Sequence, residues 1–281
     1  MNDKVCLVTG ATDGIGKEAA CALAQQGARL LIQGRDPNKG ARAIAELKAR
    51  SGNPAIEFLQ CDFASLAEVR GLAASVTERT AKLDILINNA GSIFPKRALS
   101  KDGYELTFAV NHLAPFLLTN LLLNMLTRSA PARIVTTSSV AHRGAQLNFA
   151  DLQAARKYSP MGAYGTSKLA NILFTRALAK RLDATQVTAN CLHPGLVRTS
   201  IARDMPAFGR ALFNLFAKFA RSPAQGAQTL IYLATSPEVQ GASGGYYVDC
   251  RLMPISPVAQ DRNAAERLWQ VSEELVGLAA G

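Results

Sequence analysis

"VTGATDGIG", residues 8–16, is the stretch that decides how this chain folds. It joins an apolar run at residues 4–9 to a helical pattern at residues 15–26, and its glycines follow the spacing G-x-x-x-G-x-G. A glycine-rich turn between strand and helix lets backbone N–H groups approach a pyrophosphate, and the helix amino terminus adds partial positive charge. The spacing differs from the commoner G-x-G-x-x-G fingerprint. Taken alone, the turn is also compatible with simple packing of a first helix.

Short runs rich in Val, Ile and Leu alternate with longer helical patterns along most of the chain. This alternation predicts a parallel sheet with helices on both faces, and continuous apolar strands fit burial on both sides. We therefore expect one α/β domain over residues 1–281, with a Rossmann-type, doubly wound, seven-stranded parallel sheet. The expected strands are residues 4–9, 28–34, 55–61, 83–88, 132–139, 187–193 and 244–249, and the expected helices are residues 15–26, 37–51, 65–81, 101–128 and 162–183.

Two long connections interrupt the alternation, at residues 140–161 and 194–222. Long connections in a compact domain are usually functional or disordered. Both follow strands, so they fall at the carboxyl edge of the sheet, where open α/β sheets bind ligands. The setting of the glycine turn therefore favours a dinucleotide cofactor.

Composition restricts the classes of function. The chain has 281 residues, 48% hydrophobic and 19% charged, and a formal net charge of +10 that favours anionic partners. Its basic residues are scattered and form no nucleic-acid-binding module, so we expect no nucleic-acid partner. Five cysteines without a CxxC pair indicate a reducing compartment, and three histidines without ligand spacing favour no metal. No signal peptide or apolar run of about 20 residues is evident, which predicts a soluble, cytoplasmic protein.

The end of the second expected strand, "IQGRD" at residues 32–36, bears on the choice of cofactor. An acidic residue there would bind the adenosine ribose of NAD, whereas arginine accommodates the 2′-phosphate of NADP. Asp36 precedes Pro37 and has the pattern of a helix cap. Arg35 ends the strand, and Gly34 leaves room for a phosphate. We therefore expect NADP (NADPH), with NAD as the less favoured cofactor.

In "AYGTSKLAN", residues 163–171, Tyr164 and Lys168 stand four residues apart and would share one face of a helix. A free tyrosine titrates near 10, and a neighbouring ammonium would lower that pKa and favour the phenolate. The pattern therefore predicts a phenol whose proton is loosened by a nearby cation. An amphipathic helix start that happens to hold both residues is the alternative.

Several segments, in their order along the chain, resemble the short-chain dehydrogenase/reductase family. They span nearly the whole sequence, and within that family the chain is most similar to the retinol dehydrogenase branch. Several animal members begin with a membrane anchor, which we do not expect in this sequence. The segments are "TGATDGIG" (9–16), "NNAG" (88–91), "VNHLAPF" (110–116), "TTSSVA" (136–141), "YGTSK" (164–168) and "HPGLVRT" (193–199).

The resemblance implies a role for each expected site residue. Tyr164 would transfer the proton, Lys168 would also hold the nicotinamide ribose, and Ser139 rather than Ser138 would donate to the substrate oxygen. Asn111 would hold a water in a proton relay. The residues that the resemblance places at the cofactor are Gly10, Thr12, Asp13, Gly14, Ile15, Gly16, Arg35, Asp62, Phe63, Asn89, Ala90, Gly91, Tyr164, Lys168, Pro194, Gly195, Val197 and Thr199.

The segment "FGRALFNLFAKFAR", residues 208–221, lies in the region 194–222 where the family places its substrate lid. Its basic and apolar residues fall on opposite faces of a helix, which fits an ordinary packed helix, a lid, or contact with an anionic membrane surface. We expect a lipophilic alcohol, aldehyde or ketone of the retinol/retinal type as substrate. A peripheral membrane contact through 208–221 and a homo-oligomer both stay open.

Two other functions remain at this point. A hydroxysteroid or xenobiotic carbonyl reductase would share the same four catalytic residues and differ only in the lid. A non-catalytic NADP(H)-binding sensor or scaffold would use the fold without turnover, but it has no need for all four. His193, which precedes Pro194, has the pattern of a structural residue rather than a catalyst.

Overall fold

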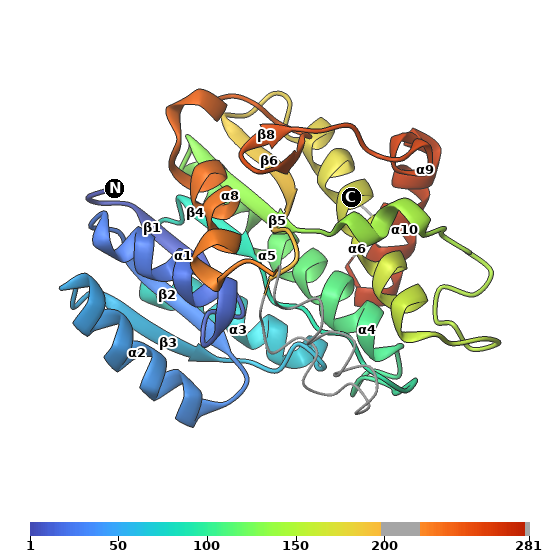
Figure 1. Ribbon diagram of the computed structural model, residues 1–281, viewed down its shortest axis with the longest axis horizontal. Helices are drawn as coiled ribbons and strands as arrows, with labels where there is room; N and C mark the ends of the chain where they lie inside the picture. Colours follow the sequence, from blue (N-terminus) through green and yellow to red (C-terminus); the bar gives the residue numbers. More distant parts are fainter. Residues whose placement is uncertain (198–219, 279–281) are drawn as a thin grey trace.

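The computed structural model describes residues 1–197 and 220–278 and arranges eight strands in one sheet, in the order β3-β2-β1-β4-β5-β6-β7-β8 (Figure 1). The first seven strands run parallel, which confirms the expected α/β fold with a parallel sheet. The strands are β1 (Val5–Val8), β2 (Arg29–Gly34), β3 (Ile56–Gln60), β4 (Ile85–Asn88), β5 (Ala132–Thr137), β6 (Val187–His193), β7 (Tyr246–Val248) and β8 (Arg251–Leu252).

The short eighth strand was not expected. β8 pairs antiparallel with β7 through a two-residue turn, in which Asp249 and Cys250 both have positive φ values, 52° and 60°. Such turns are usually built from Gly or Asn, so a turn made of Asp and Cys carries no clear hairpin signal in the sequence. The sheet therefore ends in a small antiparallel edge.

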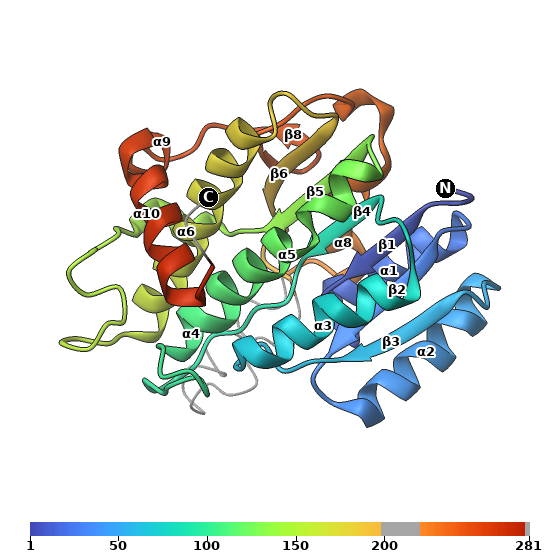
Figure 2. The same ribbon diagram turned by 180° about the vertical axis from the view of Figure 1, so that it is seen from behind.

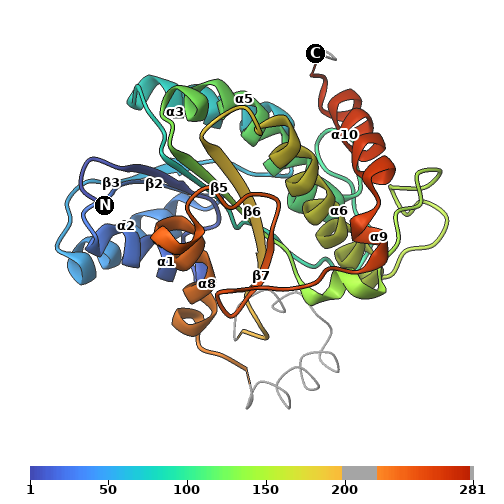
Figure 3. The same ribbon diagram turned by 90° about the horizontal axis from the view of Figure 1, so that it is seen from above.

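Helices cover both faces of the sheet. Figure 1 shows α1, α2 and α8 on one face, and Figure 2, from behind, shows α3, α5, α6 and α10 on the other. Seen from above in Figure 3, the sheet lies between these two layers. The helices are α1 (Gly14–Gln25), α2 (Pro37–Ser51), α3 (Leu66–Arg79), α4 (Leu106–Phe108), the π-helical η1 (Ala109–Leu113), α5 (Ala114–Arg128), the 3-10 helix η2 (Val140–Gly144), α6 (Pro160–Arg181), α8 (Pro223–Thr235), the 3-10 helix η5 (Pro237–Val239), α9 (Pro257–Gln260) and α10 (Arg262–Val276).

The strand order places a switch point between β1 and β4. The chain moves outward from β1 to β2 and β3, then crosses back to β4 and continues to β5, β6 and β7. Loops that leave β1 and β4 at their carboxyl ends therefore diverge to opposite faces and leave a crevice between them. This crevice is where the glycine turn and the residues after β4 meet.

The expected helix at residues 101–128 begins later than predicted. Helical structure starts at Leu106, because Glu105 caps it: its carboxylate accepts from the N–H groups of Thr107 and Phe108, both at 2.8 Å. The chain before this cap forms a turn, and Leu99 and Glu105 make an antiparallel bridge across it. The π-helical turn η1 then interrupts the helix, and such turns are frequent at functional sites.

Among the described residues, the stretch Leu106–Arg128 is long and apolar enough to cross a membrane by length and composition alone. The expectation that no segment reaches this limit is therefore wrong. Most of the stretch, 72% of its apolar window, is buried inside the molecule, where α5 packs against β4, β5 and α3. Burial of this kind is also found in the core helices of soluble proteins.

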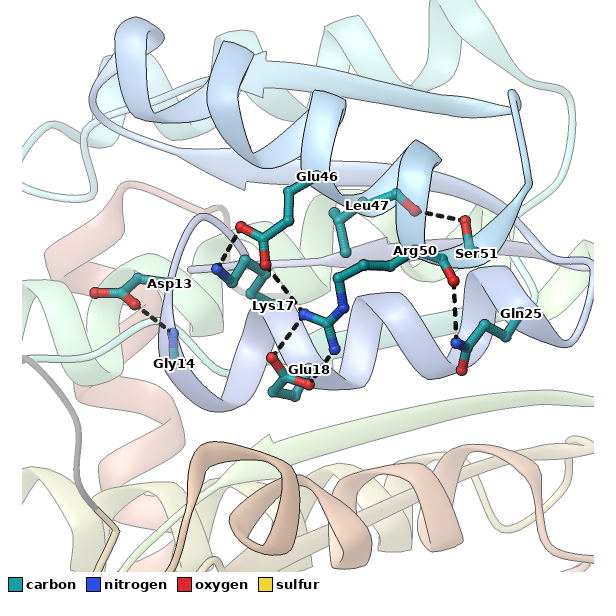
Figure 4. Close-up of polar contacts among 9 residues, drawn as sticks. All are labelled: Asp13, Gly14, Lys17, Glu18, Gln25, Glu46, Leu47, Arg50 and Ser51. Atoms are coloured by element: carbon teal, nitrogen blue, oxygen red, sulfur yellow. Dashed lines mark hydrogen bonds and ion pairs between the residues drawn. The ribbon is translucent and has the colours of Figure 1, made fainter.

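Four charged side chains fasten α1 to α2 on the outer surface (Figure 4). The Arg50 guanidinium makes two hydrogen bonds to the Glu18 carboxylate, at 2.9 and 2.7 Å, and a third to Glu46 at 3.1 Å. Lys17 donates to the other oxygen of Glu46 at 2.7 Å. The hydrogen bond from Arg50 lowers the pKa of Glu18, and that from Lys17 lowers the pKa of Glu46. The cluster positions α1, whose first turn faces the crevice.

We expect Arg50→Met to lower the free energy of unfolding by about 1 kcal/mol, the upper range for exposed ion pairs. The loss should shrink in about 1 M NaCl, where the screening length is about 3 Å. It should also shrink as the pH falls through the lowered pKa values of Glu18 and Glu46, because protonation removes the attraction. Urea unfolding measures the difference. Lys48→Met, at an exposed site on the same helix, is the control, and a loss that salt leaves unchanged contradicts an electrostatic origin.

Candidate active site

A cavity of about 920 Å³ lies along the carboxyl edge of the sheet, from the ends of β2 and β3 to the ends of β5 and β6. Its volume is within the range of sites that enclose a cofactor or a large ligand. The glycine turn, the residues after β4 and the first turns of α6 all contribute to its walls. The cavity therefore brings together segments that lie far apart in the sequence.

The glycine turn packs tightly against the residues that follow β4. A Cβ atom at Gly10 would lie 2.8 Å from Ala90 Cα, and one at Gly16 would lie 2.4 Å from Asn89 Nδ2 and 2.5 Å from the Gly10 carbonyl oxygen. The Thr9 hydroxyl accepts from the backbone N–H groups of Asn89 and Ala90, at 2.9 and 3.1 Å. Gly10 and Asn89 line the cavity, whereas Gly16 lies behind the wall and allows the close approach.

The first turn of α1 faces the cavity and suits an anionic group. Thr12, Asp13, Gly14 and Ile15 line it, and Gly14 has a φ of 58° that favours glycine. Asp13 caps the helix, and its carboxylate accepts from the Gly14 N–H at 2.8 Å. Helix amino termini favour negative charge, and the missing side chains at Gly10 and Gly14 leave the backbone open to a ligand. These residues fit the pyrophosphate of a dinucleotide.

At the β2 end of the cavity, two cations face the space. Arg35 and Lys39 line it, and within residues 1–197 and 220–278 neither side chain makes an ion pair. The Asp36 carboxylate instead caps α2 and accepts from the N–H groups of Asn38 and Lys39, which lowers its pKa. Asp36 is therefore engaged in the helix cap, as its position before Pro37 predicts. Asp62 and Phe63, after β3, complete this wall.

Ser139, Tyr164 and Lys168 line the other end of the cavity. Ser139 hydrogen-bonds to Tyr164, which lowers the pKa of Tyr164, but burial raises it more, so the pKa lies above its ordinary value. The neighbouring Ser138 turns away and donates to the Lys168 carbonyl at 2.7 Å, in line with the choice of Ser139. The hydroxyls of Ser139 and Tyr164 thus face one space.

The position of Lys168 does not support the expectation that its ammonium lowers the pKa of Tyr164. The residue is 2% exposed, and its ammonium donates to the Thr137 carbonyl at 3.0 Å and lies 5.5 Å from the centroid of the Tyr164 ring. Burial lowers the pKa of Lys168 to about 8. In this structure, therefore, burial of the hydroxyl determines the pKa of Tyr164, and the predicted depression is wrong. The ammonium lies over the ring face rather than beside the oxygen.

Asn111 lies behind the cavity, in the π-helical turn η1. Its side chain is fully buried, accepts from the Ser92 N–H at 2.8 Å, and donates to the Ser92 carbonyl and the Ser167 hydroxyl at 2.9 and 3.0 Å. A Cβ atom at Gly91 would lie 3.1 Å from Asn111 Oδ1 and 3.3 Å from Lys168 Nζ. Asn111 therefore joins the loop after β4 to α6 beside Lys168, and its role in a proton relay stays a prediction.

The segment after β6 forms the last wall. Pro194, Gly195 and Val197 line the cavity, as does His193, whose pKa is lowered to about 4 by burial, which leaves the ring neutral. Of the expected residues here, Thr199 lies outside the described part of the chain. The expected lid helix at 208–221 also lies outside it, except for its last two residues.

Arg221 connects the segment after β6 to the turn between β7 and β8. Its N–H donates to the Leu196 carbonyl at 2.8 Å, and Val197 and Arg221 form a parallel bridge. Its guanidinium makes a two-bond ion pair with Asp249 on the β7–β8 turn and lies against Gly195, where a Cβ atom would be 2.9 Å from Arg221 Cδ. The two ends of the intervening segment are thus held next to each other.

Gln33 is a structural part of the site that the sequence reasoning missed. Its side chain accepts from the Gly10 N–H at 3.0 Å and donates to the Cys61 carbonyl at 2.7 Å, and it lines the cavity. The signal was a polar residue inside the apolar run of β2. The other cavity residues that were missed are Lys39, Cys61, Ala64, Ser92, Ile93, Phe94, Leu99, Lys101, Leu106, Val110, Thr137, Val140, Ala141, Met161 and Leu196.

Comparison with known proteins connects this geometry to a family. A family model described as short chain dehydrogenase matches residues 4–208. Retinol dehydrogenase 14 of Mus musculus is 43% identical, covering 99% of this chain and 87% of its own length, and retinol dehydrogenase 12 of Mus musculus is 45% identical, covering 98% and 87%.

Solved structures share the fold. A crystal structure of a protein from Mycobacterium paratuberculosis has a TM-score of 0.79 and 32% identity, covering 98% of this chain and 94% of its own. The NADP active-site complex of RhlG from Pseudomonas aeruginosa has a TM-score of 0.71 and 27% identity, covering 92% and 97%.

The buried ammonium gives a prediction for Lys168→Met. Because the folded pKa of about 8 lies below the ordinary 10.5, the folded state holds the proton less tightly than the unfolded chain. The cost to stability is complete below pH 8 and fades as the pH rises to 10.5. Lys168→Met removes this cost, so at pH 8 the variant gains free energy of unfolding relative to the wild type. As the pH rises from 8 to 10.5, this relative gain should fall by about 3 kcal/mol. Urea unfolding at several pH values measures it, and a difference that does not change with pH contradicts a buried charged Lys168.

Proposed function

The chain belongs to the short-chain dehydrogenase family, in its retinol dehydrogenase branch, and is an oxidoreductase that acts on alcohol and carbonyl groups; on that premise we propose that it transfers hydride between NADP and a lipophilic substrate of the retinol/retinal type. One observation carries the proposal. A single cavity has two cations at the β2 end, the Ser139 and Tyr164 hydroxyls at the other, and an apolar rim.

The choice of NADP rests on the charges at the end of β2. Arg35 and Lys39 line the cavity where the adenosine ribose of a bound dinucleotide would lie, and an arginine suits a 2′-phosphate because its planar fork donates two hydrogen bonds. The carboxylate that would favour NAD, that of Asp36, is bonded to the backbone of α2. Solved relatives from several bacteria are complexes with NADP or NADPH, which agrees with this choice.

The bound nicotinamide would supply or take the hydride, and the residues of this chain would handle the proton. Burial keeps the pKa of Tyr164 above its ordinary value, so its hydroxyl is protonated at neutral pH. It can then donate that proton as negative charge develops on a carbonyl oxygen. The Ser139 hydroxyl, on the same side, can hold the substrate oxygen and stabilise the developing charge.

Lys168 would contact both Tyr164 and the part of the site that holds the cofactor. With a pKa near 8, its amine is mostly charged at neutral pH, and it lies over the face of the Tyr164 ring, 5.5 Å from the ring centroid. Its position next to Gly91 and Thr137 leaves it at the cavity wall, within the part of the site that would hold the nicotinamide ribose.

The substrate class rests on the rim of the cavity. Leu99, Val140, Met161 and Leu196 all line it and are about half exposed, from 47% to 55%. Apolar side chains left in water at the mouth of a cavity are typical of binding surfaces for apolar molecules. We therefore assign the rim to the apolar part of the substrate, with its oxygen at Ser139 and Tyr164.

Arg35→Ala tests the cofactor. We expect the KM for NADPH to rise about 10- to 100-fold, the effect of losing charge-assisted hydrogen bonds to a phosphate, with little change in the KM for NADH. Steady-state absorbance of the two cofactors measures both values. Arg42→Ala, an exposed arginine on α2 outside the cavity, is the control. A wild-type preference for NADH, or an equal loss for both cofactors, would refute the assignment.

A panel of retinal, long-chain aldehydes, steroid ketones and small polar aldehydes tests the substrate. We expect the highest kcat/KM for retinal or the long-chain aldehydes. Met161→Ser should raise the KM for these by about fivefold, equivalent to about 1 kcal/mol of lost apolar contact, and leave small aldehydes unaffected.

Two controls complete this experiment. Leu252→Ser removes an apolar side chain of similar exposure that does not line the cavity, and it should change nothing. Tyr164→Phe should lower kcat about 10²- to 10⁴-fold while NADPH still binds. Better turnover of small polar aldehydes than of retinal would refute the substrate class, and full activity of Tyr164→Phe would refute the role of the hydroxyl.

A further inference from the structure

A line of buried polar side chains runs from the C-terminal helix α10 to the acceptor of Lys168. The Ser272 hydroxyl lies 2.9 Å from His112 Nε2, and His112 Nδ1 lies 3.4 Å from Asn171 Oδ1. Asn171 Nδ2 donates to the Thr137 carbonyl at 3.3 Å, the same oxygen that accepts from Lys168 Nζ at 3.0 Å. None of the four side chains that make these bonds is more than 2% exposed.

The direction of the hydrogen bonds in this line is fixed by the carbonyl at its end and by the neutral ring of His112. The Thr137 carbonyl can only accept, so Asn171 must present its amide nitrogen to Thr137 and its oxygen to His112. His112 then donates from Nδ1. Burial lowers the pKa of His112 to about 4, so the ring is neutral, and its unprotonated Nε2 accepts from the Ser272 hydroxyl.

The surroundings of His112 are apolar, so burying this line of polar side chains costs free energy that packing alone would not require. The rings of Phe108, Phe116 and Phe174 lie 5.0, 6.0 and 6.2 Å from the imidazole. Apolar side chains would fill this space without the cost of burying polar groups. In such a low-dielectric interior, hydrogen bonds in series strengthen and orient one another. The line thus gives Asn171 a single fixed orientation.

Asn171 also completes a set of contacts between the end of β5 and α6. Ser138 donates to the Lys168 carbonyl, and Lys168 and Asn171 both donate to the Thr137 carbonyl. The end of β5 leads directly to Ser139, and α6 carries Tyr164. These contacts therefore control how the two hydroxyls and the ammonium lie relative to one another.

We propose that Asn171 is a positioning residue for the reaction: by sharing the Thr137 carbonyl with Lys168, it fixes the ammonium and the Ser139 end of β5 against Tyr164, and Ser272 and His112 orient it from α10. The inference rests on the proposed function, because it assigns this geometry a role in hydride transfer. Asn171 itself does not line the cavity.

The test uses Asn171→Leu, which keeps the size of the side chain and removes its hydrogen bonds. We expect kcat/KM with NADPH and the best carbonyl substrate to fall about tenfold, within the range that misplaced catalytic groups cost. Thr175→Val is the matched control. It removes another buried hydroxyl from α6, one that donates to the Asn171 backbone carbonyl and hydrogen-bonds to the Cys191 thiol, and it should leave kcat/KM within twofold of the wild type, that is, within about 0.4 kcal/mol.

Ser272→Ala keeps the proposal testable if Asn171→Leu fails to fold. Alone it should lower kcat/KM about threefold, and in the double variant it should add almost nothing, because the line is already cut at Asn171. A nitrogen NMR measurement of labelled His112 should find the proton on Nδ1 in the wild type and a changed Nε2 signal in Ser272→Ala.

The outcomes separate this inference from the proposed function. A wild type that turns over no carbonyl with NADPH refutes both. An active wild type with normal kinetics in Asn171→Leu, or with multiplicative effects in the double variant, refutes only the positioning role. A His112 proton on Nε2 also refutes it, because the direction of the line would then be wrong.

Discussion

The close contact between the glycine turn and the residues after β4 is the constraint on which the site depends. A Cβ atom at Gly10 or Gly16 would overlap Ala90 or Asn89, and the Thr9 hydroxyl holds both of those residues through their backbone N–H groups. This contact sets the spacing between β1 and β4 at the switch point. The first turn of α1 can face the cavity only because neither Gly10, before the helix, nor Gly16, inside its first turn, has a side chain.

Burial, more than charge pairing, sets the chemistry at the other end of the cavity. It raises the pKa of Tyr164 and lowers that of Lys168 to about 8, so the phenol holds its proton more tightly than the ammonium does. A neutral phenol is the form that can donate a proton to a developing alkoxide. The apolar packing of α6 against β5, which buries Lys168, therefore separates the proton affinities of the two groups.

Much of the fold could be predicted, because each of the seven parallel strands is a continuous apolar run between turns. The eighth could not, because its turn uses Asp249 and Cys250 at positive φ. Most expected cofactor residues line the cavity, since they stand where strands end. Gln33 was missed because its side chain bonds to two distant backbone groups, and the pKa of Tyr164 was misjudged because burial cannot be read from a spacing of four residues. Asn111 contacts the site from behind, through partners on two other segments.

The ion pair of Arg221 with Asp249 bears on how far the length of the segment between Val197 and Ala220 can vary. The Leu196–Arg221 hydrogen bond and this ion pair hold together the chain on either side of residues 198–219. The entropy cost of closing a segment grows only slowly with its length. Segments of other lengths could therefore be grafted between Val197 and Ala220 without moving Ser139, Tyr164 or Lys168.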